Sequence, residues 1–227
     1  MIDFHSHILP AVDHGASSLE ASAEMLNQAK KAGVATIVAT PHFYLHKNNL
    51  DAFLERRKQA CSELNNYIAE NSSIGIRVIP AAEVALESKL LTIDLRKLAI
   101  EGTDSILIEM PMFGGWHSWM YDMLYEIESR FSLNVILAHV DRYEKENVSR
   151  LLDMGFIAQI NAESLVKGSF FRKRKMRSLC QNGAIHLLGS DAHDSVERSY
   201  QDMILASKKL SPELLSYFDT NAKQIIK

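Results

Sequence analysis

The chain has 227 residues with a formal net charge of −3, and 47% of its residues are hydrophobic and 23% charged. This composition is ordinary for a folded globular protein and excludes a disordered chain. The weak net charge provides no long-range attraction to nucleic acid or to an anionic membrane, so neither is expected as the main partner, although a local charge cluster could still act.

Short β-rich runs alternate with helix-length amphipathic segments along nearly the whole chain. Such alternation is typical of βα units built around a parallel sheet. Seven strands are predicted, at Ile2 to His5, Val34 to Thr40, Ile76 to Ala81, Ser105 to Glu109, Asn134 to His139, Phe156 to Asn161 and Ala184 to Gly189.

Helix signals separate these strands. Ser17 and Glu20 have the spacing of a capping box, and Gly33 follows the same segment as a helix stop. The predicted helices span Ser17 to Ala32, Asn49 to Glu70, Ser118 to Arg130, Glu144 to Met154, Leu165 to Gln181, Val196 to Leu210 and Pro212 to Ile226.

Nothing in the sequence marks a domain boundary, because it has no internal repeat, low-complexity stretch or Pro/Ser-rich linker. We therefore expect one domain over residues 1–227. Seven βα units favour an α/β fold with a closed or nearly closed barrel, although an open doubly wound sheet would show the same periodicity.

The cysteine content limits the compartment and one chemistry. Cys61 and Cys180 are too few for a disulfide framework and fit a reducing compartment. With no secretory signal and no apolar run near the roughly 20 residues of a membrane span, we expect a cytoplasmic protein without membrane insertion. A thiolate tyrosine phosphatase is excluded, because its phosphate loop needs arginine six positions after the cysteine, where this chain has Tyr67 and His186.

Side chains of the metal-binding types occur where the predicted strands end. His5 and His7 lie two apart on an extended segment, which points both imidazoles to the same side. One such pair is weak evidence, but the carboxyl ends of parallel strands converge on one rim, so the coincidence at six strands predicts a common site. The strand-end set is His5, His7, His42, Glu83, Glu109, His139, Asp191 and His193.

With His14, this set offers six imidazoles and three carboxylates and no nearby thiolate. Such ligands suit divalent Mn²⁺, Fe²⁺ or Zn²⁺, and their number implies two or three ions. Clustered ions lower the pKa of bound water to roughly 7 and stabilise the oxygens of a phosphoryl group, so hydrolysis of a phosphoester is predicted. Arg142 and Arg198 could hold the phosphate by bidentate hydrogen bonds, although surface cations are equally compatible with their spacing.

The motifs around these residues resemble the PHP (polymerase and histidinol phosphatase) superfamily over essentially the full length. They read FHSH at the start, ATPH around His42, AAEV around Glu83, AHVDRY around His139 and GSDAH around His193. MIDFHSHILPAVD and IEMP are most similar to the bacterial tyrosine phosphatases of capsular and extracellular polysaccharide synthesis. The resemblance implies a distorted (β/α)₇ barrel of the PHP type, dependence on manganese, and action on phosphotyrosine of a partner bacterial tyrosine kinase.

The same resemblance implies roles for individual residues. Independently of the resemblance, Asp13 could orient a ligand or help proton transfer, although a turn-forming aspartate explains it equally well. The polysaccharide-linked enzymes often read DDG where this chain has Asp13, His14 and Gly15, and histidine there resembles other superfamily members. Arg142 and Arg198 match phosphate-site arginines. The implied ion sites are His5, His7, Glu83 and Asp191 for one ion, Glu83, Glu109 and His139 for a second, and His14, His42 and His193 for a third.

Other functions stay open at this point. A small-molecule phosphatase of the histidinol phosphate type or a nuclease would use the same ligands, and a non-catalytic metal-binding module that docks a kinase would also retain them. The basic stretch Arg172 to Arg177 could attract an acidic phosphorylated tail or nucleic acid, but such a run is more often a solvated helix face.

Overall fold

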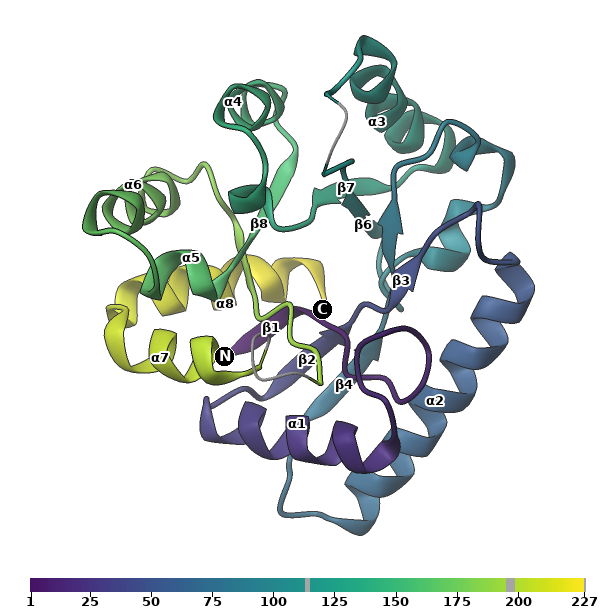
Figure 1. Cartoon of the computed structure of the whole chain (residues 1–227), viewed down its shortest axis with the longest axis vertical. Coiled ribbons are helices and arrows are strands. Elements are labelled where there is room, and N and C mark those ends of the chain that lie inside the picture. Colours follow the sequence, from purple (N-terminus) through teal and green to yellow (C-terminus); the bar gives the residue numbers. More distant parts are fainter. Residues whose placement is uncertain (113–114, 195–198, 227) are drawn as a thin grey trace.

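The computed structural model describes residues 1–112, 115–194 and 199–226. Its strands curl around the centre of the molecule, with the helices outside them (Figure 1). The strands are β1 (Ile2–Ser6), β2 (Thr36–Ala39), β3 (His42–Phe43), β4 (Arg77–Pro80), β5 (Glu83–Ala85), β6 (Ser105–Glu109), β7 (Asn134–Leu137), β8 (Ile157–Asn161) and β9 (Leu187–Gly189).

All the strand pairs are parallel. They form two arrays, in the orders β1-β2-β4 and β3-β5-β6-β7-β8-β9. Each of the short strands β3 and β5 follows its predecessor after two residues, so β2 with β3 and β4 with β5 count as single βα units. The last unit meets the first through a bridge between Ser6 and Ala192, whose carbonyl oxygen accepts a hydrogen bond from the His7 amide. The predicted distorted (β/α)₇ barrel is therefore confirmed.

The helices cover the outer surface of this barrel (Figure 1). In Figure 1, α5, α6 and α7 lie on the left and α8 extends from there to the centre beside β1, while α1 lies below the strands, α2 along the right, and α3 and α4 above. The helices are α1 (Leu19–Lys31), α2 (Leu50–Glu70), α3 (Ser118–Phe131), α4 (Lys145–Asp153), α5 (Ala162–Val166), α6 (Phe170–Gln181), α7 (Gln201–Lys209) and α8 (Pro212–Ile225), with 3₁₀ turns at Leu90–Thr92, Leu95–Leu98 and Val140–Arg142.

Two helix predictions were wrong in detail. The first helix is capped by Ser18 rather than Ser17, because the Ser18 side chain accepts the Ala21 amide hydrogen bond, whereas the Ser17 hydroxyl donates to Asp194. The helix predicted over Leu165 to Gln181 is broken into α5 and α6, because Gly168 between them has φ +84°, a left-handed conformation that cannot continue a helix. The expected start of α7 at Val196 lies outside the described residues.

The interior of the barrel is apolar at one end and polar at the other. Phe4, Leu107, Ile136 and Leu187 belong to a buried cluster within the strands, and α8 contributes Ala222 to it. Successive residues of a strand point to opposite faces, so the residue two positions later points inward again, closer to the carboxyl end. On β6 that step leads from Leu107 to Glu109. The apolar layer thus supports a polar layer at the carboxyl rim.

No helix in the described ranges is long and apolar enough to cross a membrane.

Candidate metal centre

The carboxyl rim of the barrel brings together all nine candidate ligands named from the sequence. Seven of the nine belong to overlapping groups in which every ligand atom lies within 4.8 Å of the others. Among these groups are His5, His7 and Glu83, and His7, His42 and His193. The other two join through single approaches, His139 Nε2 at 2.8 Å from Glu83 Oε1 and Asp191 Oδ1 at 3.4 Å from His7 Nε2. The nine residues come from β1 and the turn after it (His5, His7 and His14), β3 (His42), β5 (Glu83), β6 (Glu109), the end of β7 (His139) and the end of β9 (Asp191 and His193).

Glu83 lies at the centre of the cluster and is almost fully buried. Its Oε2 atom is 3.2 Å from His5 Nε2, 3.3 Å from His7 Nε2 and 2.9 Å from His42 Nδ1. Its Oε1 atom is 2.8 Å from His139 Nε2. One carboxylate therefore faces four imidazoles from the ends of three strands, β1, β3 and β7, which is the position expected of a bridging ligand.

Two residues outside the ligand set orient the paired histidines of β1. The His7 Nδ1 atom is 2.7 Å from Asp13 Oδ2, and His5 Nδ1 is 3.1 Å from Gln159 Oε1. Because each of these oxygens can only accept, each Nδ1 atom donates its proton and the Nε2 lone pair is left for the cluster. The two Nε2 atoms approach within 3.2 Å of each other.

Asp13 is held in place by the backbone around it. Its carboxylate accepts hydrogen bonds from the amides of Gly15 and His42 as well as from His7. Although burial opposes ionisation, the hydrogen bond and charge of His7 hold the pKa of Asp13 well below its usual range. The structure therefore places Asp13 behind His7 as an orienting carboxylate.

His14 and His193 complete the side of the cluster that faces His42. The ring centroids of His14 and His42 are 4.7 Å apart, and those of His14 and His193 are 4.9 Å apart. His193 Nδ1 is 2.9 Å from the Asp191 carbonyl oxygen, which fixes the ring against its own turn. His14 is exposed, so this side opens to solvent.

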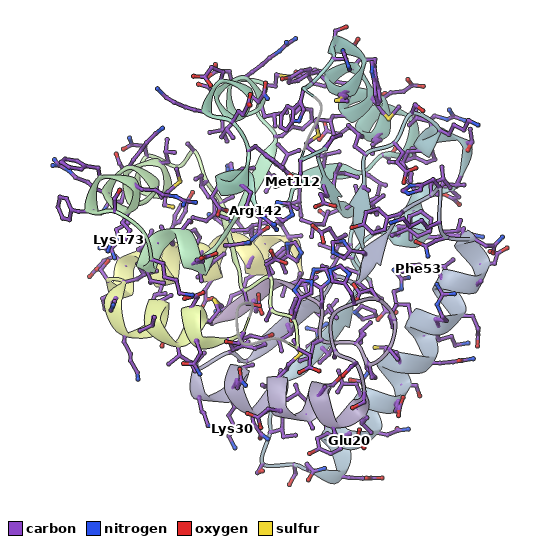
Figure 2. All side chains as sticks on the ribbon, in the orientation of Figure 1. Glu20, Lys30, Phe53, Met112, Arg142 and Lys173 are labelled. Atoms are coloured by element: carbon purple, nitrogen blue, oxygen red, sulfur yellow. The ribbon has the colours of Figure 1, made fainter. Side chains whose placement is uncertain are left out.

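Arg142 reaches the same rim from the turn after β7 and lies near the centre of the molecule (Figure 2). Its guanidinium donates to Asp191 Oδ2 over 3.1 Å, and its side chain is 30% exposed. One face of the guanidinium is thus anchored while part of it meets solvent. Arg198, the other arginine predicted from the sequence, lies outside the described residues.

Sequence reasoning missed the polar side chains of β8. Gln159 accepts hydrogen bonds from both His5 and the His139 amide and donates to Asn161, and Asn161 in turn donates to Asp191 Oδ2. Both residues are buried. A signal existed, since polar residues two apart in an otherwise apolar strand point to one face, which here is the interior.

The backbone is strained at two candidate ligands. His139 has φ +31° and Asp191 has φ +51°, values that cost residues other than glycine about 1–3 kcal/mol each. The His139 amide donates to Gln159 and the Asp191 amide donates to the His5 carbonyl, and these bonds hold both turns in place. Such strain gathers at functional sites, where it aims a side chain that regular strand geometry would misplace.

Opposite charges shift the pKa values across the cluster. Burial opposes the charge on His139, yet its hydrogen bonds to Glu109 and Glu83 raise the pKa of the imidazole to about 10. Burial likewise opposes the charge on Glu83, but the charges of His5 and His42 hold the pKa of this carboxyl well below its usual range. In the metal-free chain, His139 therefore carries a proton that a bound cation would displace.

The donor set fits divalent metal ions. Glu83 Oε2 faces three imidazole nitrogens but accepts no well-directed hydrogen bond from the described residues. Lone pairs of nitrogen and oxygen converge here without protons between them in good geometry, and this is the arrangement that a cation satisfies. Imidazole and carboxylate without thiolate select borderline or hard divalent ions.

We expect the Gly189→Ala substitution to weaken metal binding through crowding. A Cβ atom at Gly189 would lie 2.5 Å from Gln159 Nε2 and 2.6 Å from His5 Cβ, so both side chains must shift, at a cost of about 1–3 kcal/mol. Gly75→Ala is the matched control, because φ +63° makes it cost about 1–2 kcal/mol while its Cβ meets nothing. Urea unfolding should show both losses, and calorimetric Mn²⁺ titration should show weaker binding only in Gly189→Ala. Equal Mn²⁺ affinity in both variants would contradict this prediction.

The raised pKa of His139 predicts a pH dependence of the metal-free chain. Its value of about 10 exceeds the unfolded value of 6.5, so its stabilising contribution is full below pH 6.5 and is lost as pH rises through 10. The free energy of unfolding of EDTA-treated protein should therefore fall over this interval, as measured by urea titration at several pH values. The His139→Gln variant should show a smaller fall. Metal-free protein whose stability rises with pH would refute the assignment.

Comparisons with known proteins agree with this geometry. A family model for capsular polysaccharide synthesis, CpsB/CapC, matches residues 1–226. The chain is 31% identical over 242 residues to the tyrosine-protein phosphatase YwqE of Bacillus subtilis, and the alignment covers 100% of this chain and 92% of that protein. It is 27% identical over 252 residues to the tyrosine-protein phosphatase CpsB of Streptococcus pneumoniae, covering 100% and 98% of the two chains.

Solved structures show the same relationship. A crystal structure from work on YwqE of Bacillus subtilis and CpsB of Streptococcus pneumoniae, described as unique metal-dependent tyrosine phosphatases, matches with a TM-score of 0.83 at 27% identity and covers 100% of this chain and 94% of that chain. A lactonase of Listeria monocytogenes has a TM-score of 0.56 at 13% identity, covers 99% and 88%, and shares the fold alone. The expected relationship to the bacterial capsular tyrosine phosphatases is confirmed, and the chain belongs to the CpsB/CapC family of capsular polysaccharide synthesis.

Proposed function

We propose that this protein is a metal-dependent protein-tyrosine phosphatase. The observation that carries the proposal is the position of Arg142, whose guanidinium lies at the edge of a buried imidazole and carboxylate cluster and is partly exposed. A cluster that only stabilised the fold would need no cation at its open edge. The tyrosine-protein phosphatases YwqE and CpsB, which align over the full length of this chain, support the assignment.

We assign the nine candidate ligands to two or three ion sites. Close approaches support each group: His7 Nε2 is 3.4 Å from Asp191 Oδ1, and His139 Nε2 is 3.5 Å from Glu109 Oε1. Manganese is the proposed metal, with iron or zinc compatible with the same donors. One ion would be held by His5, His7, Glu83 and Asp191, a second by Glu83, Glu109 and His139, and a third by His14, His42 and His193.

Different residues of the site have different proposed roles in phosphoester hydrolysis. When bound, divalent ions at such a centre activate water and neutralise charge on the phosphoryl oxygens. Arg142 would hold phosphoryl oxygens by two parallel hydrogen bonds, with Arg198 as its proposed partner. Asp13 and Gln159 keep the His7 and His5 rings in the tautomer that presents Nε2 to the centre. Asp13 is therefore a positioning residue that acts through His7.

The proposed substrate is a phosphotyrosine-bearing protein, and within a capsular polysaccharide synthesis family we propose a bacterial tyrosine kinase. The free cysteines Cys61 and Cys180 are both buried and support a reducing, cytoplasmic location. The continuous barrel and the family match over residues 1–226 support one domain.

The substrate assignment is tested by phosphate release from a tyrosine-phosphorylated peptide and from histidinol phosphate, each with added Mn²⁺ and with EDTA. We expect hydrolysis of the peptide that depends on Mn²⁺ and is abolished by EDTA, because the donor set needs a divalent ion to activate water. Preference for histidinol phosphate would replace the proposal with a small-molecule phosphatase. Equal activity in EDTA would exclude metal-dependent hydrolysis.

Arg142→Ala separates an enzyme from a metal-binding docking module. We expect kcat on the phosphotyrosine peptide to fall by about 10²–10³-fold, because a charged donor to the phosphoryl group is removed. Arg130→Ala is the control, since Arg130 is exposed on α3 and its ion pair is with Glu126. Metal content, measured by atomic absorption, should be unchanged in both variants. Full activity of Arg142→Ala with metal retained would contradict the proposed role.

A further inference from the structure

The segment around α6 has an unusual charge. Between Glu163 and Asp191 the sequence contains six lysines and arginines and no aspartate or glutamate, although the whole chain carries a net charge of −3. Five of these cations lie on α6 itself. The remainder of the chain is therefore strongly acidic, and the positive charge is concentrated on one outer helix.

The cations of α6 are not used to pair with acids of the fold. Within the described ranges, no ion pair involves Arg172, Lys173, Arg174 or Lys175, whereas Lys167 just before the helix pairs with Asp202. Arg177 donates to the Leu165 carbonyl oxygen and is partly buried. Among the described residues, these four cations thus lie at or near the surface without a direct ion pair, although the charge of Arg172 acts on the buried Asp141.

Two phenylalanines begin the same helix. Phe170 is 69% exposed and Phe171 is 80% exposed, more than any other large hydrophobic side chain of the described residues. Their ring centroids are 6.0 Å apart, so the rings project together as one apolar pair. Apolar surface left in water at a single place marks a contact site.

One face of α6 combines both features. A shallow hollow runs along it, lined by Phe170, Lys173, Arg174 and Arg177 together with Ser178 and Gln181. These residues recur at the three- and four-residue spacing of one helix face. The helix contributes only Cys180 as a fully buried residue, so little of its surface is committed to the core. A basic strip therefore ends at an exposed aromatic pair.

We propose that α6 docks this protein on an anionic membrane surface, with its cations on lipid phosphates and the Phe170 and Phe171 rings in the interfacial layer. Helices that lie in a membrane interface combine lysine and arginine with exposed phenylalanine in this way, and a local cluster of four to eight cations binds anionic lipid. An acidic phosphopeptide in water would satisfy the cations but would leave the two rings hydrated. A lipid interface satisfies both.

The position of α6 suits this role. Asn161, at the end of β8, donates to Asp191 in the candidate metal centre, and only a short segment separates it from the first turn of α6. Lys173 lies at the periphery of the molecule while Arg142 lies near its centre (Figure 2). Docking through α6 would hold the catalytic rim beside the membrane without covering the metal ligands.

The test is co-sedimentation of the full chain with vesicles of phosphatidylcholine alone and of phosphatidylcholine mixed with phosphatidylglycerol. We expect binding to the anionic vesicles only, and weaker binding at high salt because exposed charges are screened. Lys173→Glu with Arg174→Glu should weaken binding at least about 25-fold, from roughly fivefold for each lost cation. Phe170→Ser with Phe171→Ser should remove the salt-resistant part of the binding.

The matched control is Arg56→Glu with Lys58→Glu, which makes the same charge change on the exposed surface of α2. This control should bind the anionic vesicles like the unaltered protein. Activity on a soluble phosphotyrosine peptide verifies that each variant is folded, so failure of the docking proposal is distinct from failure of the proposed function. No binding to anionic vesicles, or equal loss in the α2 control, would overturn the proposal. If the α6 variants bound anionic vesicles like the unaltered protein but lost activity on a soluble phosphoprotein, α6 would be assigned to the protein substrate and the membrane proposal would be overturned.

Discussion

The structure depends on one buried carboxylate. Glu83 is almost fully shielded from water, and burying an ionised carboxylate is costly unless opposite charge and hydrogen bonds surround it. His5, His7, His42 and His139 provide that surrounding from the ends of three strands. The barrel must therefore bring these strands to one rim in register, and the parallel βα architecture is the arrangement that does so.

Around this centre, the residues that stabilise the barrel and the residues of the candidate site occupy different layers. The apolar layer of Phe4, Leu107 and Leu187 fixes the strands, and on β6 the next inward position is the candidate ligand Glu109. β8 supplies no candidate ligand, yet Gln159 connects His5, His139 and Asn161 in one hydrogen-bonded chain. Because these bonds set tautomers and hold strained turns, the orienting residues are as important to the site as the ligands themselves.

The candidate metal centre and the proposed membrane-docking helix lie in different parts of the molecule. The candidate metal centre gathers carboxylates and imidazoles at the barrel rim, while the outer helix α6 gathers cations and exposed phenylalanines. Because the chain as a whole is weakly acidic, the concentrated charge of α6 favours its approach to an anionic surface by this helix. The family assignment to capsular polysaccharide synthesis is compatible with such a division.

The sequence by itself determined the number of βα units and the ligand types, because strand alternation and the HxH and DxH spacings are local properties. It predicted β6 at Ser105–Glu109 without error. Only the tertiary structure decided that Gln159 and Asn161 serve the cluster, because their partners lie up to 154 residues away. It also decided the capping by Ser18, since Ser17 pairs instead with Asp194, 177 residues distant. The local spacing of Gln159 and Asn161 predicts that both face the interior, but long-range pairing is invisible to local patterns, so only the fold shows which side chains they contact.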